Sequence, residues 1–324
     1  MTVPAGTFQT FQAIGNRESL SEIIYDISPT ETPFSSRVKK GKAKATLEEW
    51  QTDALDSAAA NAQVQGDDAT TNTATPTVRL RNYTQILSKT ARVSGTQEVV
   101  DKAGRDSEMA DQIRKRMSEL KRDLEFACVR NAQSTAGTAS VAATMAGIES
   151  WLATNKTSVG TGTAQTTPGY ASGTVLAPTD STVAGTLTEA ALKSVIQAIW
   201  TAGGDAKLLM VGPATKAKMS AAFTGIATRF IDVKKGQQAE ITAGADVYVS
   251  DFGRHEIVPN RFMRDQNILC LDMEYWELAQ LRPLKVTDLA KTGDSERKQL
   301  LMEVTLKVLN EKASGKVTDV NPAL

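Results

Sequence analysis

Residues 109–128 read MADQIRKRMSELKRDLEFAC and carry the strongest pattern in the chain. Apolar side chains recur there at spacings of three and four residues, which places them on one face of an α-helix. They are Met109, Ile113, Met117, Leu120, Leu124 and Cys128. The stripe predicts an amphipathic helix within 96–133 that is longer than the average helix of a globular protein. Acidic residues are interleaved with Arg114, Lys115 and Arg116, so this basic cluster indicates a solvated, ion-paired face rather than a nucleic-acid contact.

The region before this helix predicts an arm and a long hairpin. Proline follows Ser28 and Thr32, and each proline pushes its predecessor into an extended conformation. Residues 1–37 therefore indicate an arm that needs a partner surface. Residues 38–93 predict two strands around a loop rich in Ala, Asn, Asp, Gly and Thr. Such a thin hairpin cannot form its own core, so we expect it to lie across another surface.

The region after this helix predicts a mixed block of helices and strands. Residues 154–186 are rich in Thr, Ser, Gly and Ala and predict a long loop. Thr188 is a candidate N-cap of the helix that follows. Short apolar runs at 208–211 and 268–271 predict buried strands. Alternation across 302–308 predicts a half-buried strand with one apolar and one polar face.

The composition excludes several classes of function. The 324 residues contain 37 Lys+Arg and 37 Asp+Glu, so the formal net charge is zero, and nothing requires a basic stripe for duplex binding. No run of about 18 residues is predominantly apolar, so we expect no membrane-spanning helix. The first residues lack a signal-peptide pattern. Cys128 and Cys270 are far apart in the sequence, which favours buried, reduced thiols over a disulfide framework.

Residues that could carry catalysis or hold a metal are few. The single histidine, His255, cannot build a multi-histidine metal site, and its charged neighbours indicate a surface or interface role. The carboxylate pairs that are close in the sequence are Glu48/Glu49, Asp67/Asp68 and Asp272/Glu274. Glu48 and Glu49 should point to opposite faces of a strand, and the second pair lies in a polar loop. Asp272 and Glu274 could share a strand face, which makes them the best candidates for catalysis or a metal.

Other catalytic signatures are missing from the sequence. It contains no phosphate-binding loop with the required spacing and no nucleophile elbow. We therefore expect no catalytic residues, no metal and no cofactor. An arm and an extension that cannot be stable alone imply neighbours, and self-assembly through heterologous contacts is the natural inference.

The order of these parts resembles the major capsid proteins of tailed bacteriophages, the family with the fold named after phage Hong Kong 97. The motifs that carry the resemblance are 28–34 (SPTETPF), 48–53 (EEWQTD), 250–253 (SDFG), 281–283 (LRP), 290–295 (AKTGDS) and 303–306 (EVTL). Each motif alone is weak, but their order and spacing together are specific, and the resemblance covers nearly the whole chain.

The resemblance implies an α+β fold with a fixed order of parts. The expected divisions are an N-terminal arm (1–37), an extended β-hairpin loop (38–93), a peripheral domain with a spine helix (94–139), an α/β axial domain (140–278) and C-terminal strands of the peripheral domain (279–324). Because the arm motif begins near residue 28, there is little room for a built-in scaffolding segment.

The resemblance also implies a function and partners. The chain would be a structural subunit that assembles as hexamers and pentamers into an icosahedral head shell around double-stranded DNA. It would be made in the bacterial host cytoplasm and reside in the virion, with no enzymatic activity and no membrane contact. Besides itself, its implied partners are portal, scaffold and decoration proteins, and packaged DNA held by weak, non-specific contact.

The candidate contacts between subunits lie on the arm and the hairpin. They are Pro29, Pro33, Phe34, Trp50, Arg79, Arg81 and Arg92, of which the arginines could pair with acids of a neighbour. Two alternatives remain open at this level. One is another virion component, such as a decoration or tail protein. The other, less favoured, is a carboxylate-dependent hydrolase that uses Asp272 and Glu274.

Overall fold

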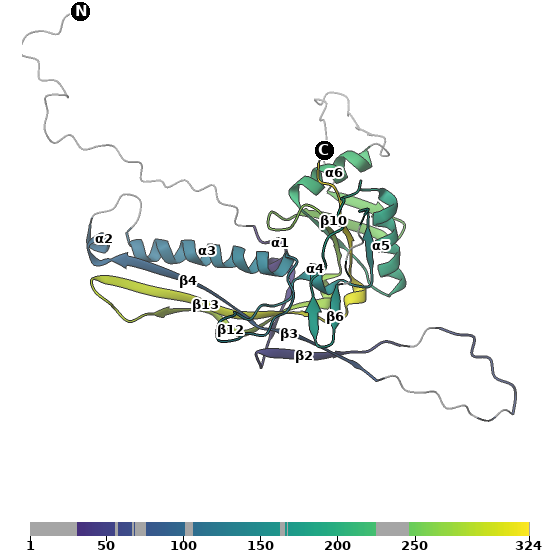
Figure 1. The fold of residues 1–324 in the computed structure, drawn as a ribbon, viewed down its shortest axis with the longest axis horizontal. Coiled ribbons are helices and arrows are strands. Elements are labelled where there is room, and N and C mark those ends of the chain that lie inside the picture. Colours follow the sequence, from purple (N-terminus) through teal and green to yellow (C-terminus); the bar gives the residue numbers. More distant parts are fainter. Residues whose placement is uncertain are drawn as a thin grey trace, which may run out of the picture.

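The computed structural model describes residues 31–55, 58–66, 68, 76–100, 106–162, 166, 168–224 and 246–323. This part of the chain forms two larger sheets, two small hairpins and several helices (Figure 1), so the expected α+β class is confirmed. Most of the predicted arm, including Pro29, lies outside the described residues, and so does Asp67. Within the described ranges, no helix is long and apolar enough to cross a membrane.

A four-stranded sheet and the long helix α3 form one elongated unit (Figure 1). The strand order is β1 (Lys39–Lys42), β12 (Trp276–Asp288), β13 (Ser295–Val308) and β4 (Gln85–Ser94). The neighbours β12, β13 and β4 are antiparallel, whereas β1 runs parallel to β12. Helix α3 (Glu108–Val129) lies along this sheet and confirms the helix predicted from the apolar stripe.

The start of α3 is capped from two directions. The Ser107 hydroxyl accepts a hydrogen bond from the Ala110 amide, as expected of an N-cap. The carboxylate of Glu98, at the end of the short helix α2 (Gly95–Val99), accepts from the amides of Glu108 and Met109. A carboxylate at this end also offsets the helix dipole.

The exposed face of α3 carries the ion pairs expected of its basic cluster. Arg114 and Lys115 both pair with Asp111, and Arg116 pairs with Glu119 one turn later. These contacts confirm that the cluster is a solvated, ion-paired face.

A six-stranded sheet with helices forms a second unit. Its strand order is β5 (Lys156–Ser158), β14 (Gly315–Thr318), β11 (Ile268–Leu271), β8 (Leu208–Val211), β10 (Gly253–Pro259) and β9 (Val247–Ser250). The central strands β8 and β11 are buried on both faces. Leu209 and Cys270 pack under helix α5 (Glu189–Thr201), while Met210 and Leu269 face the core shared with the first unit. The buried strands predicted at 208–211 and 268–271 are confirmed.

The helices of this unit begin where the sequence indicates. Thr188 caps α5 by accepting from the Ala191 amide, as predicted. Trp200, near the end of α5, stays 59% exposed beside Phe252. Helix α6 (Pro213–Thr224) begins with proline at its first turn.

Two small hairpins lie where the two units meet. Strands β2 (Leu47–Thr52) and β3 (Val78–Tyr83) pair with each other only and project from the body (Figure 1). Strands β6 (Gly169–Ala171) and β7 (Thr174–Leu176) pair beside the short helix α4 (Ile148–Trp151). The segment 154–186, predicted as a loop, therefore contains three short strands.

Strand β13 differs from its predicted half-buried pattern. Its polar residues Glu303 and Thr305 are 5% and 0% exposed. The physical reason is the chain at the end of β3, which covers this face. The Thr84 hydroxyl donates to Glu303, and the Thr305 hydroxyl donates to the carbonyl of Tyr83. Arg282 also donates a 2.7 Å hydrogen bond to the Glu303 carboxylate.

Candidate assembly interface

The β2–β3 hairpin presents apolar side chains that the described part of its own chain does not cover. Leu55 is 99% exposed and Val64 is 76% exposed. Gly66 follows Val64 closely and has a positive φ of 90°, a conformation that suits glycine at a turn. Because exposed apolar area is costly in water, these side chains indicate a surface that becomes covered by another molecule.

The base of the hairpin is held firmly. The Trp50 indole donates to the carbonyl of Val308 at 2.8 Å, and the Asn82 amide donates to the carbonyl of Leu306 at 2.8 Å. The Lys307 ammonium lies 5.8 Å from the centre of the Trp50 ring, a favourable cation–π distance. These contacts fix the direction in which the hairpin leaves the body.

The end of the arm is also held at one point. The carboxylate of Glu125, fully buried on α3, accepts from the amides of Phe34 and Ser35 at 2.9 and 2.8 Å. The side-chain amide of Asn260 donates to the same carboxylate at 2.7 Å. Short helix α1 (Pro33–Arg37) is thereby fastened to the spine helix.

Phe34, a candidate contact between subunits, packs inside its own subunit. Its side chain is 0% exposed and meets Trp276 edge-on, with ring centroids 6.1 Å apart. The ring is therefore fully covered within its own subunit, and a contact of this residue with a neighbour stays a prediction. Its arm neighbour Pro33 is partly buried in the first turn of α1.

The other candidate contacts differ in how much surface they offer. Trp50 is partly buried at the hairpin base. Arg81 donates to the carbonyl of Gly173 at 2.6 Å and so fastens the β6–β7 turn to the hairpin. Arg92 donates to the Ser295 hydroxyl at 3.2 Å from the edge of the four-stranded sheet. The Arg79 side chain is 68% exposed. Contacts of these residues with a neighbour stay predictions.

Glu48 and Glu49 lie on opposite faces of β2, as predicted. Glu48 is within 3.4 Å of Lys307 on the body side. Glu49 pairs with Arg79 at 3.5 Å and Arg81 at 3.9 Å along the hairpin. They therefore serve as separate ion-pair partners, not as a catalytic pair.

The predicted surface role of His255 is wrong. Its side chain is 1% exposed and stacks on Tyr248 of the neighbouring strand. Nδ1 donates to the carbonyl of Ala206 at 2.5 Å, and Nε2 shares a hydrogen bond of 2.6 Å with the Ser250 hydroxyl. Alternation along β10 turns this position inward, although its sequence neighbours are charged. The imidazole is a satisfied structural group.

Asp272 and Glu274 do not share a strand face, contrary to the prediction. Strand β11 ends at Leu271, and Asp272 caps the single turn Met273–Tyr275. Its carboxylate accepts from the amides of Glu274 and Asp205 at 3.1 and 3.2 Å. Among the residues that the structure describes, no group of three or more His, Cys, Asp or Glu is placed to hold a metal ion.

The two cysteines are buried and free, as predicted. Burial raises the pKa of the Cys270 thiol to about 12 and raises that of Cys128 well above its ordinary value. Both thiols therefore stay protonated and unreactive at neutral pH.

A buried ion cluster lies at the junction of the two units. Arg264 donates to Glu149 through Nη2 at 2.5 Å and Nε at 3.0 Å, and to Asp180 through Nη1 at 2.7 Å. The Lys316 ammonium, fully buried on β14, donates to the backbone carbonyl of Glu149 at 2.6 Å. Burial lowers the pKa of Lys316 to about 8. Sequence reasoning missed this cluster because its members are single charges far apart in the chain.

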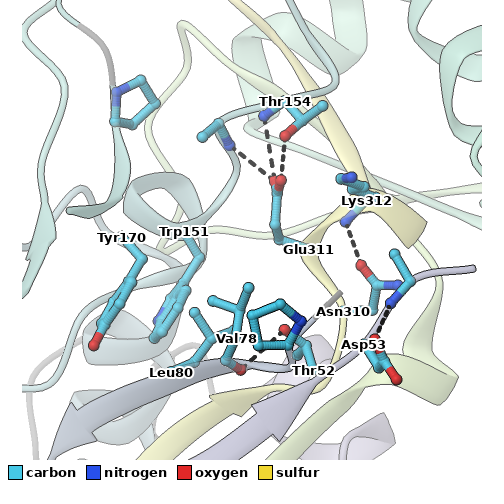
Figure 2. Close-up of a pocket in the computed structure, with 14 residues that line it drawn as sticks. Thr52, Asp53, Val78, Leu80, Trp151, Thr154, Tyr170, Asn310, Glu311 and Lys312 are labelled. Carbon is cyan, nitrogen blue, oxygen red and sulfur yellow. Dashed lines mark hydrogen bonds between the residues drawn. The ribbon is translucent and has the colours of Figure 1, made fainter. Parts of the chain in front are cut away.

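A cavity of about 480 Å³ lies beside the hairpin base (Figure 2). The rings of Trp151 and Tyr170 are parallel, with centroids 6.3 Å apart, and form an aromatic wall. Leu80 and Val78 of β3 add apolar surface, and Glu311 lies opposite (Figure 2). The cavity is thus mostly apolar with polar groups at its rim.

Comparison with known proteins gives one consistent family. The model of the SU10 major capsid protein family matches residues 3–321. The major capsid protein of Escherichia phage Phieco32 is 30% identical over 339 residues, covering 95% of each chain.

Solved structures show the same fold. The cyanophage A-1(L) capsid subunit has a TM-score of 0.67 at 10% identity, covering 96% of this chain and 98% of that one. A phage G structure of major capsid and decoration proteins gives 0.53 at 9% identity, covering 99% and 100%. These likenesses confirm the phage capsid fold expected from the Hong Kong 97 resemblance. The chain belongs to the SU10 major capsid protein family, so it is a structural subunit of a phage capsid and not an enzyme.

Proposed function

We propose that this subunit assembles as hexamers and pentamers into a closed icosahedral head around double-stranded DNA. The observation that carries the proposal is the projecting β2–β3 hairpin, whose apolar residues Leu55 and Val64 are uncovered in the single chain. A contact made by an extension of one copy on a different surface of the next is heterologous, and it closes into rings when the rotation allows.

The expected division of the chain supports this assembly with one adjustment. We propose arm 1–37, extended loop 38–93, peripheral domain 94–139 with 279–324, and axial domain 140–278. Helix α3 and strands β12 and β13 share one unit, which favours the peripheral grouping. Because β14 pairs in the six-stranded sheet, we assign 315–318 to the axial domain instead.

The charge balance supports weak contact with packaged DNA. With 37 Lys+Arg against 37 Asp+Glu, the subunit lacks the excess positive charge that would release many counterions and hold the genome tightly. Portal and scaffold proteins are further proposed partners. A decoration protein is proposed as well, because the phage G structure contains one with its capsid protein.

Electron microscopy of full-length protein tests the assembly. The protein is expressed alone and together with the scaffolding protein of its phage, and particles are imaged after size-exclusion chromatography. We expect closed shells with fivefold and sixfold capsomers in at least one case. A protein that stays monomeric in both cases, with a protease-resistant hairpin, would overturn the proposal.

Charge reversal on the hairpin tests its contact with a neighbour. Arg79→Glu should lower shell yield while subunit stability is unchanged, because the Arg79 side chain is mostly exposed. Arg81→Glu should instead destabilise the subunit, because Arg81 holds the carbonyl of Gly173 within the same chain. Equal shell yield for Arg79→Glu and wild type would contradict the proposed role of Arg79.

A further inference from the structure

The cavity beside the hairpin base has the features of a site for an apolar side chain. Its walls are the stacked rings of Trp151 and Tyr170, with Leu80 and Val78 of β3. The groups at its rim, including Asp53, Asn310 and Lys312, are polar (Figure 2). A mostly apolar hollow with a few polar groups at its edge is typical of a binding site.

One wall of the cavity carries an unsatisfied hydrogen-bond donor. The Trp151 side chain is 1% exposed, and its indole Nε1 has no partner in the described part of the chain. The other buried or half-buried indoles are satisfied: Trp50 donates to Val308, and Trp276 donates to the Ser314 hydroxyl at 3.0 Å. Leaving a buried donor unpaired costs about 1–3 kcal/mol.

The far end of the same hairpin carries a side chain that fits such a hollow. Val64 is 76% exposed, next to the turn at Gly66, and it is flanked by the amide side chains of Gln63 and Gln65. The β2–β3 hairpin projects from the body (Figure 1). The cavity is lined by residues at its base, such as Thr52 and Val78, whereas Val64 belongs to the loop between its two strands. A short apolar side chain flanked by two neutral amide side chains is complementary to a cavity that has apolar walls and a polar rim.

We propose that Val64 of one subunit inserts into the hairpin-base cavity of a second copy of this chain. The contact is head to tail: the Val64 of each subunit enters the cavity of the next, and its own cavity receives the Val64 of the previous one. The same contact then repeats around a ring. The side chains that flank Val64, Gln63 and Gln65, are polar, as are the groups at the cavity rim. This inference rests on the proposed self-assembly and names the surfaces that meet.

Disulfide crosslinking between two single-cysteine variants tests the contact. Thr154 is an exposed residue at the cavity, so Val64→Cys and Thr154→Cys place one thiol on each predicted surface. The native Cys128 and Cys270 are buried and do not compete. The two full-length variants are mixed, assembled and oxidised, and the products are separated by denaturing electrophoresis. We expect a dimer band that requires both variants and the assembled state.

Controls separate this inference from the proposed function. Val141→Cys, at an apolar residue 51% exposed elsewhere in the chain, replaces Val64→Cys in a matched mixture and should give no more than background dimer. Shells that form without a Val64–Thr154 dimer would overturn the inference while the proposed function stands. A third mixture pairs Thr154→Cys with Phe8→Cys, which carries its thiol on the N-terminal arm. If this mixture crosslinks and the Val64→Cys mixture does not, the arm occupies the cavity and the inference is overturned. Failure to form shells would count against the proposed function itself.

Substitution of Val64 gives a second test that does not depend on crosslinking. Val64→Asp should reduce shell yield at least tenfold and leave subunit unfolding unchanged, since its side chain is exposed in the single subunit. Val141→Asp is the matched control and should assemble at wild-type yield. Equal yields for Val64→Asp and Val141→Asp would contradict the proposal.

Discussion

The buried ion cluster predicts a large loss of stability from a single isosteric change, Glu149→Gln. Glu149 is 0% exposed and receives two hydrogen bonds from Arg264, at 2.5 and 3.0 Å. Removing one partner of a buried ion pair costs about 3–5 kcal/mol. The expected loss is smaller, about 2–3 kcal/mol, because the Arg264 side chain is 32% exposed and keeps its contact with Asp180.

The same change should alter how stability depends on pH. Burial lowers the pKa of Lys316 from 10.5 to about 8, and the charge of Glu149 opposes this shift. The unfolded chain therefore binds more protons than the folded chain between pH 8 and 10.5, and this group makes stability rise with pH across that window. Without the Glu149 charge, the folded pKa of Lys316 falls further, so the rise should begin below pH 8.

Urea unfolding of the full-length, unassembled subunit measures both effects. It is followed by tryptophan fluorescence at several pH values between 6.5 and 10. Glu296→Gln is the control, since it breaks the exposed pair with Lys291 and should leave the midpoint unchanged. If Glu149→Gln and Glu296→Gln unfolded at the same urea concentration, the structural role assigned to the cluster would be refuted.

Three further predictions follow from other buried groups. Lys316→Met should abolish the rise in stability between pH 8 and 10.5, which is worth about 3 kcal/mol for a pKa shift of this size. Urea unfolding at several pH values measures this rise, and an undiminished rise would contradict the prediction. Glu125→Ala should destabilise the subunit by about 3 kcal/mol, because the amides of Phe34 and Ser35 lose their acceptor. Limited proteolysis should then cut faster just before Phe34, and an unchanged cleavage rate would show that the arm is held elsewhere. Cys128 and Cys270 should react with a thiol reagent only after unfolding, because both thiols are buried and protonated; rapid labelling of the native subunit would contradict this.

The elements that sequence patterns identified share one property: their signal is local. The stripe from Met109 to Cys128 corresponds to α3, and the runs 208–211 and 268–271 correspond to β8 and β11. Apolar spacing reports the period of the backbone directly, whatever lies elsewhere in the chain. The hairpin was also predictable, because a polar, glycine-containing loop between two strand patterns is a local signal.

The errors occurred where burial depends on distant segments. His255 has charged neighbours in the sequence, yet the pairing of β10 with β8 and β9 turns it inward. The spacing of Asp272 and Glu274 predicts a shared strand face, but the Asp272 carboxylate caps a turn. The burial of Phe34 is likewise invisible in the sequence, because Trp276, more than two hundred residues later, covers it.

The sequence alone determined the class of this protein: the order of an arm, a hairpin, a long helix and a mixed block, together with motifs of a capsid family and no catalytic set. Only the tertiary structure decided which charges meet, as in Glu149, Arg264 and Lys316, and where the cavity beside the hairpin lies. The physical reason is the separation along the chain between the residues that make contact. Secondary structure follows from contacts between residues a few positions apart, whereas burial, pKa shifts and cavities arise from side chains that meet only after the chain has folded.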